Sequence, residues 1–227
     1  MKALAIDTAV TKITVASRNE DKTVTEIFDI GMKQSETLLP SVIDVMEKNK
    51  LEVKDLDCLA VCAGPGSFTG LRLGFACIKA LEMSAEKPLF AFSTLDVYAE
   101  PFVSLPFTIL SVIDAHKERF YFKAFSDGKE VIPEGDYDIE KIISLLADVK
   151  SEKEYLVCGP DSEKFRTIMK EAGVTKKMHA MTFTYSPADS LFKLAEKDLL
   201  NGKTGLADYD GPVYLRSSDA EVATPTS

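Results

Sequence analysis

The sequence LAIDTA at Leu4–Ala9 contains a short apolar run, Leu4–Ile6, that is followed directly by Asp7, a pattern typical of the end of a buried strand. A second run, VIDAH at Val112–His116, ends its apolar residues in the same way. Each run is followed by a few polar residues and then by a further strand pattern, at Ile13–Ala16 and at Phe120–Phe125. Because self-similarity marks a duplicated unit, we expect two copies of one architecture.

The duplication extends downstream to a buried strand that runs into a Gly-Pro turn and then into a helix. LAVCAGPGS at Leu59–Ser67 has its counterpart in YLVCGPDS at Tyr155–Ser162. Apolar periodicity and end signals predict helices over Ser35–Asn49, Phe68–Ala85, Ile139–Val149, Glu163–Ala172 and Pro187–Leu200.

Strands that lead into helices, twice over, indicate an α/β fold of two tandem subdomains, each a mixed sheet with flanking helices. We expect the first subdomain at residues 1–103, which includes the predicted helices at 35–49 and 68–85, and the second at 104–216. The last helix is free to pack back on the first subdomain. Residues 217–227 are small, polar and aperiodic, which predicts a disordered tail.

Composition narrows the classes of protein. The chain has 227 residues, and 45% of them are hydrophobic, enough to bury a real core. With 27 Lys and Arg against 36 Asp and Glu the net charge is −9, which disfavours autonomous binding to a nucleic-acid backbone. No apolar run is long enough to span a bilayer, and Asp7 comes too early for a signal peptide, so a cytoplasmic location is expected. Four cysteines without a CxxC pair predict reduced, structural thiols.

The glycine-rich stretch Gly64–Gly74, GPGSFTGLRLG, does not fit the catalytic motifs that it superficially suggests. A P-loop needs a Gly-Lys-Ser/Thr end, and a nucleophile elbow around Ser67 needs glycines where a proline and a threonine stand. The only histidines are His116 and His179, so a serine hydrolase is disfavoured. They form no HxxxH or HExxH pair, and no metal site is predicted.

The same stretch is better suited to helix packing. Gly70 and Gly74, four residues apart on a helix, expose a strip of backbone that another helix could approach closely. Both this helix and the one at 35–49 are broadly apolar and need cover, which an oligomer or a protein partner would supply. Burial of a central helix within the monomer is the alternative. The predicted interface residues are Ser35, Glu36, Leu39, Val42, Ile43, Met46, Ser67, Phe68, Thr69, Gly70, Leu71, Arg72, Gly74, Phe75 and Ile78.

Two tandem α/β units, each opening with a hairpin that carries an aspartate, resemble the superfamily of actin, sugar kinases and Hsp70 (the ASKHA fold). In that superfamily the hairpin turns bind nucleotide phosphates and usually carry a glycine after the aspartate. Here Asp7 is followed by Thr8 and by no glycine as far as Thr11, and the turn after Asp114 lacks one too. Asp7, Thr8 and Asp114 are therefore predicted to be degenerate phosphate-loop positions, with residual nucleotide binding as the minority alternative.

Five stretches carry a more specific resemblance, and Ala60–Arg72 is the most distinctive of them. The others are Leu4–Thr8, Gln34–Pro40, Ile113–Ala115 and Pro212–Arg216. Together they resemble the TsaB (YeaZ) family, a bacterial subunit of the machinery that makes threonylcarbamoyladenosine beside the tRNA anticodon. That family commonly has His-Ser-Glu where this chain has Gln34-Ser35-Glu36, which puts in doubt any role that needs a titrating imidazole.

The resemblance implies a non-catalytic scaffold, an inactive paralogue of TsaD, which holds the catalytic metal and transfers the threonylcarbamoyl group. TsaB-like proteins form dimers, alone or with TsaD, through the two helices described above, and they support TsaE binding. The resemblance further implies no cofactor on this chain, ATP and metal on TsaD and TsaE, and contact with tRNA only through the complex. The alternatives are a glycoprotease-like hydrolase using Ser67 and a nucleotide-dependent small-molecule kinase on the same fold.

Overall fold

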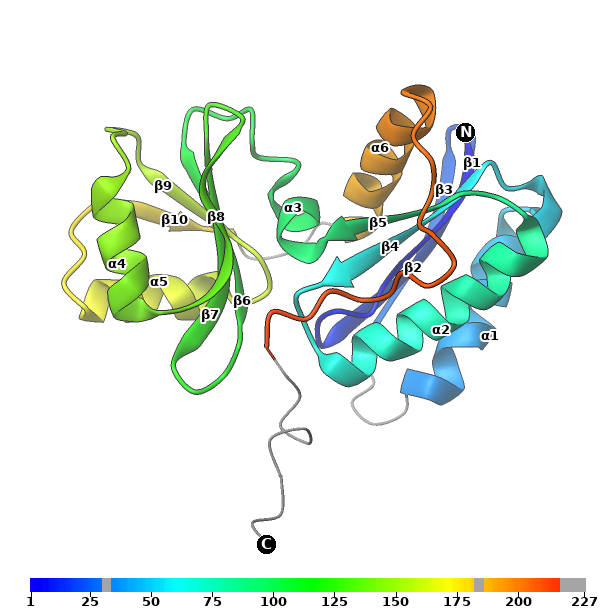
Figure 1. Cartoon of the computed structure of the whole chain (residues 1–227), viewed down its shortest axis with the longest axis horizontal. Coiled ribbons are helices and arrows are strands. Elements are labelled where there is room, and N and C mark those ends of the chain that lie inside the picture. Colours follow the sequence, from blue (N-terminus) through cyan, green and yellow to red (C-terminus); the bar gives the residue numbers. More distant parts are fainter. Residues whose placement is uncertain (30–33, 182–185, 217–227) are drawn as a thin grey trace, which may run out of the picture.

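Two five-stranded mixed sheets with the same topology form the framework of the chain (Figure 1). The computed structural model describes residues 1–29, 34–181 and 186–216. The first sheet has the order β3-β2-β1-β4-β5 and contains β1 (Lys2–Asp7), β2 (Lys12–Asn19), β3 (Lys22–Asp29), β4 (Cys58–Gly64) and β5 (Leu89–Ser93). The second has the order β10-β9-β6-β7-β8 and contains β6 (Thr108–Asp114), β7 (Arg119–Ser126), β8 (Lys129–Asp138), β9 (Tyr155–Cys158) and β10 (Met178–Ala180).

The strand pairing repeats from one sheet to the other. The central strand pairs antiparallel with its hairpin partner and parallel with the strand after the next helix, so that β1 lies between β2 and β4 and β6 lies between β7 and β9. Asp7 and Asp114 are the last residues of these two central strands. The predicted α/β class with two tandem mixed sheets is confirmed.

Six α-helices flank the sheets in the described part of the chain. They are α1 (Gln34–Lys48), α2 (Phe68–Ala85), α3 (Thr94–Ala99), α4 (Ile139–Asp148), α5 (Ser162–Glu171) and α6 (Pro187–Leu200), with a short 3-10 helix, η2 (Val53–Asp55). The ends of the five predicted helices fall within one residue of the observed ends. The sixth, α3, spans six residues, too few to establish a helical period in the sequence.

Both faces of the first sheet are buried, by different helices. Leu4 and Ile6 of β1 belong to the core beneath α1 and α2, whereas Ala3 and Ala5 on the opposite face pack in the core that contains α6. Alternation of side chains along a strand separates the two sets. The face that carries alanines lets α6 lie close to the sheet.

One helix crosses to the other half of the chain, and another lies between the halves. α6 follows the second sheet but packs on β1 and β4 of the first, whereas α3 follows β5 and contacts β4, β5 and α6 as well as β6 and β7 of the second sheet. We call the first sheet with α1, α2 and α6 the first lobe, and the second sheet with α4 and α5 the second lobe; α3 joins the two. Figure 1 shows α3 between the lobes and α6 against the first sheet.

Between α6 and Arg216, the last described residue, the chain forms no helix or strand, and it runs along the first lobe to the second (Figure 1). The predicted disordered tail, residues 217–227, lies outside the described residues. Among the described residues, no helix combines the length and the apolar character needed to cross a membrane.

Candidate functional site

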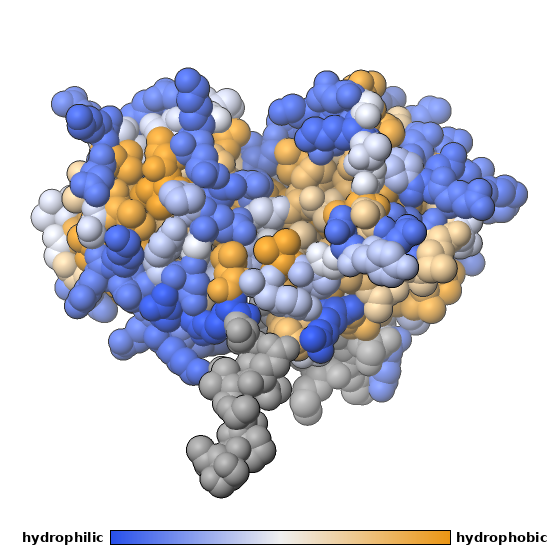
Figure 2. Space-filling view, in the orientation of Figure 1, coloured by the Kyte–Doolittle hydropathy of each residue, from blue (hydrophilic) through white to orange (hydrophobic). Residues whose placement is uncertain are grey.

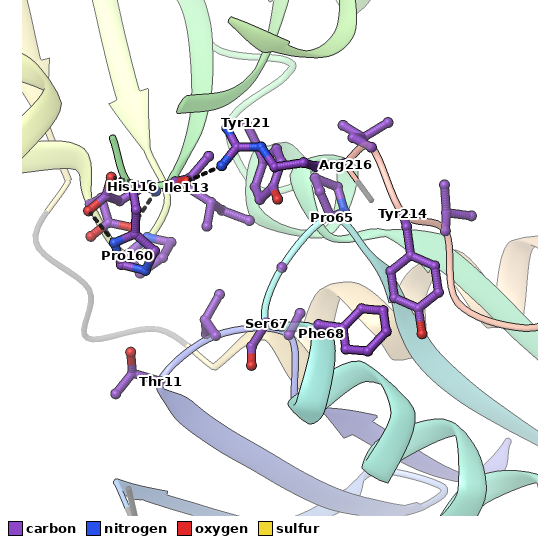
Figure 3. A pocket seen from close by; sticks show the side chains of 18 residues that line it. Thr11, Pro65, Ser67, Phe68, Ile113, His116, Tyr121, Pro160, Tyr214 and Arg216 are labelled. Carbon is purple, nitrogen blue, oxygen red and sulfur yellow. Dashed lines mark hydrogen bonds and ion pairs between the residues drawn. The ribbon is translucent and has the colours of Figure 1, made fainter. Parts of the chain in front are cut away.

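A cavity of about 410 Å3 lies between the lobes (Figure 3). Its first-lobe wall is the β1–β2 turn and the start of α2, including Thr11, Ser67 and Phe68. Its second-lobe wall includes Asp114 and His116 of the β6–β7 turn, and Val213 to Arg216 of the C-terminal segment form a further side. The two hairpin turns that the sequence repeat predicted to be equivalent therefore meet at one site.

Asp7, at the first turn, is fully buried and bonded within the chain. The Ala9 N–H donates to its Oδ1 at 2.9 Å, and the Tyr98 hydroxyl donates to its Oδ2 at 3.0 Å. Burial raises the pKa of Asp7 despite these donors, because no cation compensates the desolvated carboxylate in the described surroundings. Thr8 is also buried, and its Oγ1 has no hydrogen-bond partner among the described residues. Neither side chain is presented to the cavity.

The glycine-rich stretch is what encloses this turn. A Cβ atom on Gly66 would lie 2.2 Å from the Ala9 carbonyl oxygen, and one on Gly70 would lie 2.1 Å from the Thr8 carbonyl oxygen. A Cβ on Gly74 would lie 2.2 Å from Thr8 Oγ1. The expectation that Gly70 and Gly74 leave room for a helix of another subunit is therefore wrong, since the β1–β2 turn of the same chain fills that room.

The β6–β7 turn is more open than the β1–β2 turn, and it carries charged side chains. Lys164 Nζ donates to Asp114 Oδ2 at 2.5 Å, the His116 N–H donates to Oδ1 at 3.0 Å, and the Asp114 N–H donates to Asp161 Oδ2 at 2.8 Å. Burial by itself would raise the pKa of Asp114, but the donors from Lys164 and His116 outweigh it and lower that pKa. Burial raises the pKa of Asp161. Asp114 is thus a paired carboxylate at the cavity wall.

Ser67 caps α2, and its hydroxyl accepts a hydrogen bond from the Gly70 N–H at 3.2 Å. His116 and Asp114 lie on the opposite wall of the same cavity, a proximity that their sequence positions did not reveal. His116 Nδ1 lies 3.7 Å from Asp114 Oδ2. Ser67 in this arrangement orders a helix start, which is a structural role.

Seven of the 15 predicted interface residues are buried by their own chain, Gly70 and Gly74 among them. Val42, Met46, Leu71, Phe75 and Ile78 are buried in the cores on either side of the first sheet, which corrects their assignment as apolar area for a partner. The cause is that α1 and α2 lie on the sheet with these residues inward. Of the rest, Glu36, Leu39, Ile43, Ser67, Thr69 and Arg72 are exposed and Phe68 is half-buried, while the Ser35 side chain, like that of Gln34 before it, lies outside the described part.

The outward stripe of these helices is apolar, and it combines Leu39 and Ile43 of the predicted set with residues that were not predicted. Leu39 and Ile43 of α1 are 53% and 51% exposed, and Met83 of α2 is 81% exposed. We call the surface formed by Leu39, Pro40, Ile43, Ala76, Ala80 and Met83 the α1–α2 face. Figure 2 shows apolar residues along α2 at the lower right of the view. The sequence signal that was missed is the 76-80-83 spacing, which follows one side of a helix.

The cysteines and acidic groups add no second site in the part described. All four cysteines are free, as predicted, and burial raises the pKa of the Cys58 and Cys158 thiols to about 12. Among the described residues, no group of three or more His, Cys, Asp or Glu side chains could hold a metal ion.

A family model described as TsaD, tRNA N6-adenosine threonylcarbamoyltransferase, matches residues 31–224, which is most of the chain. The chain belongs to this family. Within it, the relatives are of the predicted TsaB (YeaZ) kind: the tRNA threonylcarbamoyladenosine biosynthesis protein TsaB of Escherichia coli (strain K12) is 28% identical, over 97% of this chain and 96% of that protein.

Solved structures agree on the fold. YeaZ from Pseudomonas aeruginosa superposes with a TM-score of 0.75 at 22% identity, covering 94% of this chain and 99% of that one. A Bacteroides thetaiotaomicron protein with an actin-like ATPase fold gives a TM-score of 0.50 at 11% identity, covering 85% and 95%. These similarities confirm the predicted actin-like fold.

Proposed function

We propose that this chain works in tRNA threonylcarbamoyladenosine biosynthesis as a non-catalytic subunit that docks onto a TsaD-type transferase. Its TsaB relative carries that pathway in its name and matches this chain along nearly its whole length. The α1–α2 face is the observation that carries the docking role, because it leaves Leu39, Ile43 and Met83 in water in the isolated chain.

The first turn supports an accessory role rather than a catalytic one. A phosphate-binding turn must present backbone amides to its ligand. Here the start of α2 packs against that turn so tightly that three glycines are needed, and the Asp7 carboxylate is sealed beneath it. Metal and ATP would then be held by the TsaD and TsaE partners, and tRNA would be reached only through the complex.

The α1–α2 face can also bind a second copy of this chain when the TsaD-type partner is absent. Apolar side chains on two adjacent helices bury well against a matching helix pair, and a self-complementary patch closes as a two-fold dimer. The homodimer and the heterodimer with a TsaD-type protein would then compete for one surface.

The test is reconstitution of tRNA modification from the transferase, TsaE and the threonylcarbamoyl-adenylate synthase, with and without this chain. Ile43→Asp should abolish both association, measured by light scattering, and modification. Ile27→Asp is the matched control, since Ile27 is also 51% exposed but lies on β3. The next residue, Phe28, packs beneath α1 and α2, so Ile27 points to the opposite face of the sheet, away from the α1–α2 face. Modification that proceeds equally well without the chain would refute the role, and an Ile43→Asp variant that still associates would refute the surface.

A further inference from the structure

The segment after α6, residues 203–216, is a strap that joins the two lobes. It follows the edge of the first sheet, where the Leu206 N–H donates to the Leu89 carbonyl oxygen at 2.8 Å. It then crosses to β4, where the Val213 N–H donates to the Ala63 carbonyl oxygen at 2.7 Å. Ordering a chain without helix or strand costs conformational entropy, so this cost must be offset by such contacts with the two lobes.

An aromatic stack fixes the strap to the first lobe. The Tyr214 ring lies 4.8 Å from the Phe68 ring, centroid to centroid, and the Arg72 guanidinium lies 3.8 Å from the Phe68 centroid on α2. Arg72 Nε also donates to the Tyr214 hydroxyl at 3.4 Å. Gly64 allows the close approach, because a Cβ there would lie 2.5 Å from the Val213 carbonyl oxygen.

Arg216 fixes the strap to the second lobe. Its Nε and Nη2 donate to Asp136 Oδ2 at 3.0 and 2.8 Å, and its Nη1 donates to the Ala115 carbonyl oxygen at 3.0 Å. Asp136 lies on β8, and Arg119 Nε donates to its other oxygen at 2.9 Å. Arg216 therefore meets a carboxylate already oriented by a second guanidinium, and Figure 3 shows its side chain among the residues that line the cavity.

We propose that residues 211–216 are a releasable clamp that sets the opening of the cavity between the lobes. Other polar contacts that join the lobes through α3 are made on this helix or at its two caps: Lys123 with Asp96, Ser93 with Glu134, and Lys193 and Ser190 of α6 with Glu100. The strap joins the lobes at the cavity, away from α3, and its last residues form part of the cavity wall. Release of the strap leaves α3 as the hinge and gives solutes access to the cavity.

The contact of Tyr214 with Phe68 and Arg72 also borders the α1–α2 face. Arg72 is exposed and lies one turn before Ala76 on the same side of α2, so a protein docked there can draw Arg72 away from Tyr214. Docking and clamp release are then coupled, each favouring the other. Only this coupling between docking and clamp release rests on the proposed function. The experiment below uses the isolated full chain, so a negative result would refute the clamp and would not bear on docking to a TsaD-type protein.

The opening can be measured with spin labels at Thr11→Cys and Glu118→Cys, two exposed positions on the facing turns. The background is Cys77→Ala, since the other three cysteines are buried and react slowly. Pulsed electron resonance should give one narrow distance for the clamped chain. Arg216→Ala and, independently, Tyr214→Ala should give a longer mean distance and a broader distribution.

Two variants show whether the change is specific to the clamp. Arg216→Lys keeps the charge but not the two-pronged contact, so its distribution should be intermediate. Arg166→Ala is the matched control, because Arg166 pairs with Glu163 inside α5 and makes no hydrogen bond or ion pair with the described residues of the strap. Distance distributions for Arg216→Ala and Tyr214→Ala that superpose on that of the parent would overturn the clamp.

Discussion

Replacing Gly74 with alanine tests whether the glycine-rich stretch exists to seat the β1–β2 turn. In an exposed helix this change would be favourable by roughly 1 kcal/mol, because alanine loses less conformational entropy than glycine. Here the new Cβ would lie 2.2 Å from Thr8 Oγ1, far inside a van der Waals contact. Overpacking of this kind costs about 1 to 3 kcal/mol. We expect Gly74→Ala to lower the free energy of unfolding by about 1 kcal/mol on balance.

The clash has an identified partner, so it can be relieved. Thr8→Ala removes Oγ1, whose hydrogen-bonding capacity is unmet among the described residues, and leaves only Cβ, 3.3 Å from the new atom. The double variant should therefore recover the stability lost in Gly74→Ala, with a coupling of about 1 to 3 kcal/mol. Gly70→Ala is the control, because its Cβ would meet the Thr8 carbonyl oxygen at 2.1 Å, and that backbone atom stays in place in Thr8→Ala.

Urea unfolding followed by circular dichroism gives the four free energies of each cycle by linear extrapolation. The reasoning predicts strong coupling between positions 74 and 8 and near-additivity between positions 70 and 8. A Gly74→Ala variant more stable than the parent would refute it, and so would equal coupling in the two cycles.

Two further predictions concern the cavity region. Asp7→Asn should stabilise the chain at pH 8, because the folded state raises the pKa of Asp7 and so disfavours its charged form by about 1.4 kcal/mol per pKa unit. Since a raised folded pKa means that stability is lost as pH rises from about 4 through that pKa, the advantage of the variant should shrink on acidification; an advantage that grows towards pH 4 in urea titrations would contradict this. Ser67→Ala should lower the free energy of unfolding by about 1 kcal/mol through loss of the α2 cap, whereas Ser67→Asp should retain it, and equal thermal midpoints for the two variants would argue against the capping role.

Much of the architecture was predictable because it depends on the order of neighbouring residues, such as the apolar period of a helix and the residues at its ends. Helix ends coincided at Phe68 and Ala85, where a serine cap precedes the first turn and the apolar period stops. The repeated strand that ends in Asp7 and again in Asp114 predicted the duplicated sheets. The packing of α6 on the first sheet and of α3 between the lobes has no such local signal, because which sheet a helix covers depends on the path of the whole chain.

The site was predicted less well, for a related reason. Periodicity identifies that α2 is apolar nearly all round, but it does not say which neighbour covers which side. Gly74 could equally face a second helix or a turn of its own chain, and only the position of Thr8 decides between them.

The sequence by itself therefore determined the duplicated α/β architecture and the loss of glycine from the first turn, because strand alternation, helical period and turn chemistry are properties of neighbouring residues. Only the tertiary structure decided that the start of α2 fills that turn, that Ala76, Ala80 and Met83 form the outer stripe, and that Arg216 reaches Asp136, 80 positions away in the chain. These are contacts between residues distant in sequence, and their energies depend on packing distances that no local pattern encodes.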